Sequence, residues 1–391
     1  MITFENTEIA FHNRSNAELR KTFWLFKLMS YNKLVRIGKH ILNFSVIIHL
    51  PISKLLKHTI YRHFCGGESL IEASATINSL RFYNIKAILD YSVEGKENEA
   101  GFSNALNETL ATIRFAASNP DVPFTVFKPS AFGKQGNLEK SSNDKIQTAI
   151  ENAELNNFKQ RIETLCKTAF ELDIPIMIDA EHSYYQKIID MVCEEMMEKY
   201  NTEKAIVYNT IQLYRIDRLE FLKMIFQKAC DKSYYLGIKF VRGAYLEKER
   251  ERAKRLNYQS PVYYEKAQTD SDFNEALRFS IEHINRISIF NGTHNEESSK
   301  YLTILMSQAG LPNNDSRVWF SQLYGMGDNI SYNLADKGYN VAKYIPYGPV
   351  KFVMPYLIRR AEENTSVKGQ TSHELDLILK EMKRRKNLRI K

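Results

Sequence analysis

Eight short apolar runs, each followed by a segment long enough for a helix, dominate the sequence from residue 85 onward. Runs of this length that are rich in Val, Ile, Phe and Tyr are typical of buried strands. Eight such strands alternating with helices predict a (β/α)8 barrel of the TIM type. The predicted strands are AILDYSV (87–93), FTVFKPSAF (124–132), IPIMIDAE (174–181), AIVYNTIQLY (205–214), LGIKFVRGAY (236–245), ISIFNGTHN (287–295), RVWFSQLYG (317–325) and VAKYIPYG (341–348).

A doubly wound α/β sheet is the alternative fold, but its Gly-rich phosphate turn does not follow the first apolar run. Residues 7–60 are predicted to be helical, since apolar residues recur there at helical spacing. We therefore expect an N-terminal helical arm (1–60), a barrel domain (61–370) and a basic C-terminal tail (371–391). The polar stretch 134–148 is predicted to be a loop.

Positive charge is concentrated at the two ends of the chain. Residues 1–60 carry nine Lys and Arg against three Asp and Glu, and residues 380–391 carry seven against one, although the net charge is only +8. Basic ends of this kind suit contact with anionic lipid headgroups. They also suit nucleic acid, but no nucleic-acid-binding motif is present, so we expect no such partner. A solubilising role for the tail is the plain alternative.

The expected location is the cytoplasm or the inner face of a membrane. The first residues lack the basic and apolar regions of a secretory signal. The longest apolar stretch, 44–56, is interrupted by polar residues and too short to span a bilayer. Four scattered cysteines fit a reducing compartment better than a disulfide framework or a zinc site.

Polar side chains gather where the predicted strands end, which is where barrel enzymes carry their chemistry. A glycine just past a strand, as in the run 242–245, lets the backbone approach a ligand closely. The result is a tyrosine-rich rim with several cations and one clear carboxylate. Its members are Lys128, Asp179, Gln212, Arg242–Tyr245, Thr293, His294 and Tyr344.

A helix carrying two adjacent arginines follows the last predicted strand, after a turn at Gly348. Tyr356, Arg359, Arg360 and Glu363 have the spacing i, i+3, i+4, i+7, so they share one helix face. Guanidinium groups grip carboxylates in a forked, bidentate manner. A solvated face is the ordinary interpretation of such a charge run. Its position directly after the last strand favours a binding role.

A catalytic metal and an activated nucleophile are both disfavoured by the residues at hand. Asp179, Glu181, His182 and His294 have the right chemistry for metal ligands. However, there is no paired histidine motif, and Lys128, Arg242 and Arg359 would crowd cations around the ion. No nucleophile is held by a base in the manner of a triad. An anion clamp with aromatic walls instead indicates that a bound cofactor performs the difficult step.

Taken together, these motifs make the sequence resemble the monofunctional proline dehydrogenases, a family of FAD-dependent barrel enzymes. The resemblance covers residues 60–366. It is carried by GGES, AILDY, FKPSAFG, IDAEH, KFVRGAYLEKER, GTHN, FSQLYGMGD and YIPYGPVKFVMPYLIRRAEEN. The form of YIPYGPV and GAYLEKER is similar to the branch that includes the mitochondrial enzymes.

The resemblance implies a role for each matching residue. Arg359, Arg360 and Lys128 would bind the carboxylate of proline, while Tyr245, Tyr344 and Tyr356 would wall its ring. Asp179 and Lys239 would act at the catalytic centre, Asp179 by orienting the surrounding groups and Lys239 beside flavin N5. FAD would contact Ala180, Gln212, Lys239, Val241, Arg242, Gly243, Ala244, Thr293, His294 and Glu363.

The implied reaction transfers a hydride from proline C5 to flavin N5, giving Δ1-pyrroline-5-carboxylate. This is the first step of proline catabolism to glutamate, with a membrane quinone as the electron acceptor. Two residues depart from the long bifunctional bacterial enzymes, Lys239 in place of arginine and Leu246 in place of tryptophan. They leave open the hydrogen bonding at the flavin edge. The alternative substrate is 4-hydroxyproline, whose dehydrogenases tend to have a smaller residue where this chain has Tyr344.

Overall fold

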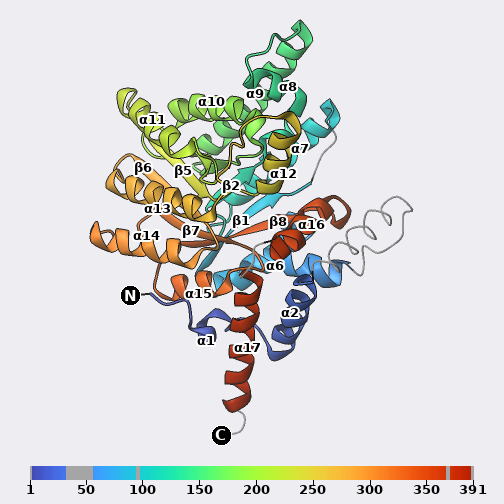
Figure 1. Cartoon of the computed structure of the whole chain (residues 1–391), viewed down its shortest axis with the longest axis vertical. Coiled ribbons are helices and arrows are strands. Elements are labelled where there is room, and N and C mark those ends of the chain that lie inside the picture. Colours follow the sequence, from blue (N-terminus) through green and yellow to red (C-terminus); the bar gives the residue numbers. More distant parts are fainter. Residues whose placement is uncertain (1, 32–55, 94–96, 367–369, 389–391) are drawn as a thin grey trace.

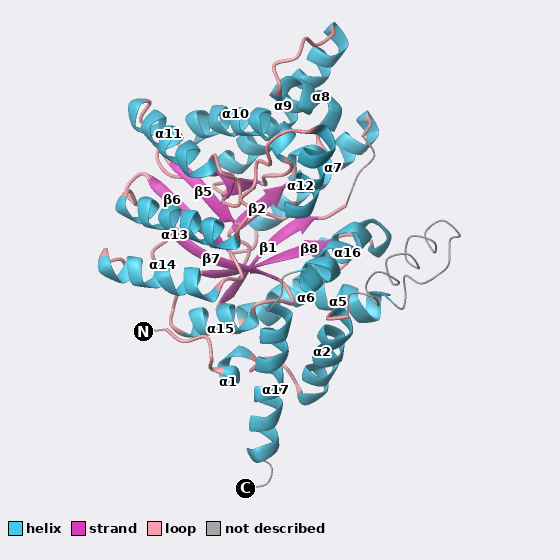
Figure 2. Cartoon of the chain, viewed as in Figure 1, coloured by secondary structure: helices cyan, strands magenta, loops and turns pink. Residues whose placement is uncertain are grey.

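The structure, a computed structural model, describes residues 2–31, 56–93, 97–366 and 370–388; the side chains of residue 58 and of residues 362–366 and 370–372 lie outside the description. Eight strands form one closed barrel, in which each strand runs parallel to the next and β8 closes on β1 (Figure 1 and Figure 2). This confirms the predicted (β/α)8 fold.

Each of the eight predicted strands is present, and most are shorter than the apolar run that predicted them. Their ends were overestimated because the polar residues after each strand belong to loops. The strands are β1 (Ile85–Tyr91), β2 (Phe124–Phe127), β3 (Ile176–Ile178), β4 (Val207–Gln212), β5 (Leu236–Val241), β6 (Ile287–Gly292), β7 (Val318–Leu323) and β8 (Val341–Tyr347).

Helices surround the barrel, and their apolar faces pack on the outer faces of the strands (Figure 2). Several begin at a side-chain cap, such as Ser69, Asn98 and Thr148, which each accept a backbone N–H. The helices around the barrel are α6 (Leu70–Arg81), α7 (Glu99–Ala117), α9 (Ala149–Glu171), α10 (Ser183–Tyr200), α11 (Arg218–Asp231), α12 (Leu246–Leu256), α13 (Lys266–Glu282), α14 (Glu296–Gln308) and α15 (Asp328–Asp336).

The prediction of a loop over 134–148 was wrong for its first part. Residues Gln135–Ser142 form helix α8, which packs against α10. Leu138 of this helix is buried, and the Asn137 amide donates to the carbonyl of Glu151 at 2.7 Å. The helix was missed because one apolar residue among many polar ones gives no helical periodicity, and its stability comes from tertiary contacts.

A second core lies beside the barrel, where the N-terminal helices meet the C-terminal ones. Helices α1 (Thr7–Ala10), α2 (Asn16–Met29) and α5 (Arg62–Phe64) and the π-helix η1 (Lys57–Tyr61) supply part of it. Helices α16 (Val350–Ser366) and α17 (Gln370–Leu388) supply the rest, including Leu357 and Ile378. Thus most of the expected basic tail is a packed helix. Residues 32–55 of the expected arm lie outside the description, and the boundaries at residues 60 and 370 stay predictions.

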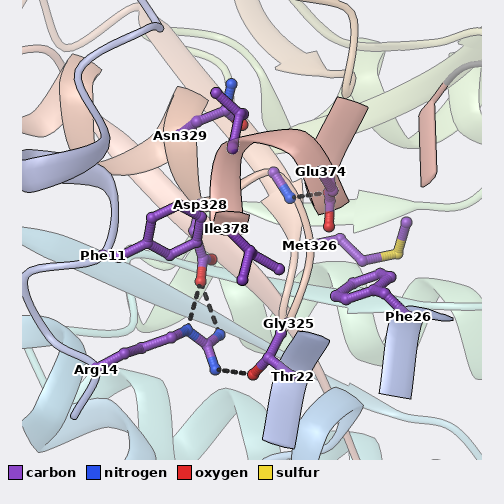
Figure 3. A pocket seen from close by; sticks show the side chains of 12 residues that line it. Phe11, Arg14, Thr22, Phe26, Gly325, Met326, Asp328, Asn329, Glu374 and Ile378 are labelled. Carbon is purple, nitrogen blue, oxygen red and sulfur yellow. Dashed lines mark hydrogen bonds and ion pairs between the residues drawn. The ribbon is translucent and has the colours of Figure 1, made fainter. Parts of the chain in front are cut away.

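Buried charges tie this second core to the barrel, around a small pocket (Figure 3). Arg14 donates two hydrogen bonds to Asp328 at the start of α15, and Lys343 of β8 lies 2.9 Å from the same carboxylate. Glu374 of α17 accepts the backbone N–H of Gly327 at 2.8 Å. Among the helices described, none is long and apolar enough to cross a membrane.

Candidate active site

The inward side chains at the carboxyl ends of five strands form one charged layer. Inside the barrel, Ile88, Val126, Met177 and Tyr344 belong to an apolar cluster. Since side chains alternate along a strand, the residue two positions after an inward one also points inward. By this rule three further side chains point inward. They are Asp90, two positions after Ile88; Lys128, two positions after Val126; and Asp179, two positions after Met177. Lys239 lies two positions after Gly237, where a Cβ would meet the Tyr208 ring of the same cluster.

These five side chains form one continuous network of hydrogen bonds centred on Tyr344. Lys128 Nζ lies 2.6 Å from Asp90 Oδ2 and donates to the Tyr344 hydroxyl at 3.2 Å. That hydroxyl donates to Asp179 Oδ2 at 3.0 Å. Lys239 Nζ donates to Asp179 Oδ1 at 2.6 Å, and the same ammonium lies 4.7 Å from the centroid of the Tyr344 ring.

The surroundings of Tyr344 and Asp90 shift the pKa of each group and so determine which of the two carries a proton. Burial, together with the charges of Asp179 and Asp90, raises the pKa of Tyr344 well above its usual value, so the phenol remains a donor. Burial alone would raise the pKa of Asp90, but Lys128, Ser92 and Tyr344 outweigh it and hold that pKa below its usual value. Asp90 is therefore a carboxylate at neutral pH.

Asp90 is the member of this network that the sequence did not mark as a site residue. It lies at the end of β1, is 1% exposed and accepts hydrogen bonds from both Lys128 and Ser92. The sequence marked one clear carboxylate on the rim, Asp179, because Asp90 is enclosed by apolar and aromatic residues of its strand. The signal was present, since Asp90 stands two positions after the apolar Ile88 within the motif AILDY.

A second group of predicted residues meets on the ends of β5 and β6. Arg242 donates to Asp270 at 2.8 Å and to the Thr293 hydroxyl at 2.6 Å, and its guanidinium lies 4.3 Å from the ring centroid of Phe273. Gly243 follows with φ of +124°, a conformation that L side chains rarely adopt. A Cβ there would lie 2.5 Å from the Tyr214 ring, so only glycine fits the position.

Two predicted cofactor contacts carry buried polar atoms that have no hydrogen-bond partner among the described residues. These atoms are Oε1 of Gln212, at the end of β4, and Nδ1 of His294, after β6. His294 Nε2 accepts the N–H of Leu323 at 3.3 Å, so the neutral ring carries its proton on Nδ1. Burial and the charges of Lys343 and Arg360 lower the pKa of His294 to about 3. One free acceptor and one free donor suit a planar cofactor with polar edges, such as a flavin.

Helix α16 carries the predicted carboxylate clamp and approaches the site through Arg360. Arg360 is 7% exposed, its guanidinium lies 5.0 Å from the Tyr356 ring centroid, and its charge acts on His294. Arg359 is half-buried. The Glu363 side chain lies outside the described residues. Gly348, with φ of +134°, makes the predicted turn into this helix.

The other predicted contacts lie around this rim. Tyr245 precedes α12, and its ring centroid is 4.3 Å from that of His182. Val241 is the last residue of β5, Ala180 follows Asp179 and is half-buried, and Ala244 is exposed.

The residues that were considered as metal ligands have separate partners. Glu181 accepts hydrogen bonds from both the N–H and the hydroxyl of Ser130, while His182 lies 3.5 Å from Glu249. Asp179 is bound to Lys239 and Tyr344, as described above. In the described part of the chain, these groups do not converge on one point.

Comparison with known proteins identifies one matching family. The sequence profile of the proline dehydrogenase family matches residues 73–373. The chain is 36% identical to the carbapenem antibiotics biosynthesis protein CarD of Pectobacterium carotovorum subsp. carotovorum, over 82% of this chain and 83% of that protein. It is 32% identical to the mitochondrial proline dehydrogenase 1 of Dictyostelium discoideum, over 97% of this chain and 74% of that protein.

Solved structures with the same fold include proline utilization A from Bdellovibrio bacteriovorus inactivated by N-propargylglycine. The two superpose with a TM-score of 0.73 at 20% identity, over 92% of this chain. The match covers 38% of the solved chain, so this protein corresponds to about two fifths of that larger one.

Proposed function

The chain belongs to the proline dehydrogenase family, and from this premise we propose that it oxidises L-proline to Δ1-pyrroline-5-carboxylate with a bound FAD. The observation that carries the proposal is the network of Asp90, Lys128, Tyr344, Asp179 and Lys239 at the carboxyl ends of the strands. In barrel enzymes this end of the barrel carries the active site.

We propose that Lys128, Arg359 and Arg360 bind the carboxylate of proline. A lysine and two guanidinium groups offer charge-assisted hydrogen bonds, which are the strongest available to a carboxylate. Arg360 is nearly buried, and burial strengthens the attraction between opposite charges. Fixing the carboxylate also fixes the reacting carbon, a positioning effect worth about 7 kcal/mol or more in favourable cases.

The ring of proline would lie against Tyr344, Tyr245 and Tyr356. Tyr344 has the best-defined position, because its hydroxyl contacts both Lys128 and Asp179 while its ring packs on the apolar interior. A ring held at both its polar and its apolar end is a rigid wall. Such a wall limits what can be attached to the neighbouring carbons of the substrate.

The same cations would prepare the substrate amine. The nitrogen lone pair assists departure of a hydride only when the amine is neutral. A positively charged site disfavours a further positive charge, so it lowers the pKa of the bound amine. Lys128, Lys239 and the two arginines outnumber Asp90 and Asp179, which gives this proposed site an excess of positive charge.

FAD would supply the acceptor of the hydride that leaves C5 of proline. The residues proposed to hold it are Ala180, Gln212, Lys239, Val241, Arg242, Gly243, Ala244, Thr293, His294 and Glu363. The free Gln212 oxygen and the His294 Nδ1 proton support this role. Lys239, held by Asp179 at 2.6 Å, would supply positive charge beside the reacting edge.

The acceptor that we propose for the electrons is a membrane quinone, with the protein at the membrane surface. The basic residues at the two ends of the chain support that location. The second candidate substrate is 4-hydroxyproline. Tyr344 argues against it, since a large aromatic wall leaves little room for a hydroxyl on C4.

The visible spectrum of the purified protein tests the proposal. We expect flavin absorption that is bleached anaerobically by L-proline, and much less by D-proline, which presents its ring and carboxylate in mirror-image arrangement. A protein that takes up no FAD on reconstitution contradicts the cofactor assignment. Flavin that L-proline leaves oxidised contradicts the substrate assignment.

A further inference from the structure

Asp90 forms a buried ion pair with Lys128, one of the residues proposed to bind the substrate carboxylate. Its carboxylate is 1% exposed, and Lys128 Nζ lies 2.6 Å from its Oδ2. The hydroxyl of Ser92 donates to the same oxygen. A buried carboxylate with two donors has a fixed position, because leaving either donor would cost it a charge-assisted hydrogen bond.

The geometry leaves one proton of the Lys128 ammonium uncommitted. An ammonium has three N–H donors. Within the described part of the chain, Lys128 uses one for Asp90 and one for the Tyr344 hydroxyl. Two fixed partners determine the direction of the third N–H, whereas a lysine without them samples many rotamers.

The ion pair of Asp90 and Lys128 has a counterpart on the other side of the network. Asp179 holds Lys239 at 2.6 Å, as Asp90 holds Lys128, and the Tyr344 hydroxyl lies between the two pairs. Each lysine thus has its own carboxylate from a different strand. Lys239 belongs to the proposed cofactor side and Lys128 to the proposed substrate side.

We propose that Asp90 is a positioning residue for proline oxidation, which holds Lys128 so that its third N–H is free to bind the substrate carboxylate. This inference rests on the proposed oxidation of proline. Asp90 acts on the substrate carboxylate through Lys128, so its loss weakens binding of proline more than it slows the chemical step. A purely structural role would instead lower stability and leave the KM for proline unchanged.

A double-mutant cycle separates the two roles. Asp90→Asn removes the charge and keeps the shape. We expect it to raise the KM for L-proline about 10-fold, equivalent to about 1.4 kcal/mol, with little change in kcat. In the Lys128→Met background the same substitution should leave the KM unchanged, because the group through which Asp90 acts is gone. Both parameters come from dye reduction at varied L-proline.

Asp121→Asn is the matched control. Asp121 is also a nearly buried carboxylate paired with a lysine, Lys86, at 2.7 Å. It precedes β2 and its partner lies near the start of β1, so the pair is at the opposite end of the barrel. This variant should lower the melting temperature and leave the KM unchanged.

Each outcome decides the question. The inference is overturned if Asp90→Asn leaves the KM unchanged, or if its effect multiplies fully with that of Lys128→Met. If Asp90→Asn alone does not fold, the double variant, which lacks both charges, should show the KM of Lys128→Met, and a higher KM overturns the inference. A wild-type protein that binds FAD but does not oxidise proline contradicts the proposed function itself, and the inference with it.

Discussion

The hydroxyl of Tyr344, on β8, donates a hydrogen bond to Oδ2 of Asp179, which follows β3, at 3.0 Å. This bond crosses the mouth of the barrel, since the two strands are not neighbours in the sheet. It holds the aromatic ring over the apolar interior. The position of the Tyr344 ring is therefore determined by the carboxylate of Asp179, which belongs to a distant part of the sequence.

Replacing Tyr344 by serine should change which substrates the site accepts. The variant loses the aromatic wall, so we expect kcat/KM for L-proline to fall about 10-fold or more, as loss of a hydrogen bond to a charged group predicts. The preference for proline over trans-4-hydroxyproline should narrow, because space opens beside C4. Tyr344→Phe is the control, since it keeps the ring and should keep the preference. Steady-state kinetics with both substrates measure this, and an unchanged preference in the serine variant would mean that Tyr344 does not line the ring pocket.

Arg360→Met should weaken binding of proline while FAD stays bound. The substitution removes a charge-assisted clamp worth about 1.5–3 kcal/mol per hydrogen bond, so the KM should rise 10-fold or more. Lys351→Met on the same helix is the control, because Lys351 is exposed. Kinetics and flavin content of both variants decide the matter. Equal KM values for Arg360→Met and the wild type would remove this arginine from the clamp.

Gly243→Ala should reduce FAD binding and stability together. The added Cβ would lie 2.5 Å from the Tyr214 ring, and φ of +124° is itself unfavourable for alanine. The loop next to Arg242 would have to move, which disturbs the proposed cofactor side. Gly136→Ala is the control, because a Cβ there has no neighbour within 4 Å. Flavin content and melting temperature should fall only in Gly243→Ala, and full flavin content in that variant would contradict the expectation.

The sequence predicted the barrel well because the strand signal is local. Each strand of a parallel barrel is a short apolar run, and a run can be recognised without knowing its neighbours. The charged layer inside the mouth was predicted only in part. Lys128 and Asp179 come directly after strands β2 and β3 and were found, as was Tyr344 within β8, whereas Asp90 within β1 was not. That it meets Lys128 depends on the pairing of β1 with β2, which one sequence does not reveal.

The helical contacts outside the barrel were the least predictable. Arg14 and Asp328 are 314 residues apart, and nothing local in either segment marks them as partners. The charge of the C-terminal segment suggested a solvated tail, but Arg384 and Arg385 both bind the buried carboxylate of Glu381. Charge alone does not distinguish a solvated helix face from one that is paired within the protein.

Glu374→Gln should make stability less dependent on pH. Burial raises the pKa of Glu374 from 4.5 to about 7. The folded protein therefore binds this proton more tightly than the unfolded chain, so stability falls as pH rises from about 4.5 to 7. Glutamine keeps the acceptor for the Gly327 N–H (Figure 3) without the charge. The variant should gain about 1–2 kcal/mol at pH 8 and little at pH 5. Denaturant unfolding at both pH values measures this, and an equal effect at both would exclude the titration of Glu374.

Membrane contact through the C-terminal helix should depend on its exposed lysines. Deleting the C-terminal part of α17 would also remove Glu381 and Arg385, which hold this helix against the N-terminal helices. Point variants are therefore the sharper test. Lys383 and Lys386 are exposed. Replacing both by glutamine should weaken binding to anionic vesicles by about 1 kcal/mol per charge at low salt. Turnover with a soluble dye should not change. Co-sedimentation that is equal for both proteins would remove this face of α17 from the proposed contact.

The docking of α17 on the N-terminal helices also determines when the protein can finish folding. The Arg385 guanidinium donates to the carbonyl of Phe11, 374 residues earlier, at 2.8 Å. A ribosome adds roughly 5–20 residues per second, so about 20–75 s separate the synthesis of these two segments. Throughout that interval Leu19 and Phe26 of α2 lack Leu377 and Ile378, their partners in the second core. The first helices made are thus among the last to be covered, so their apolar faces stay exposed while the rest of the chain is synthesised.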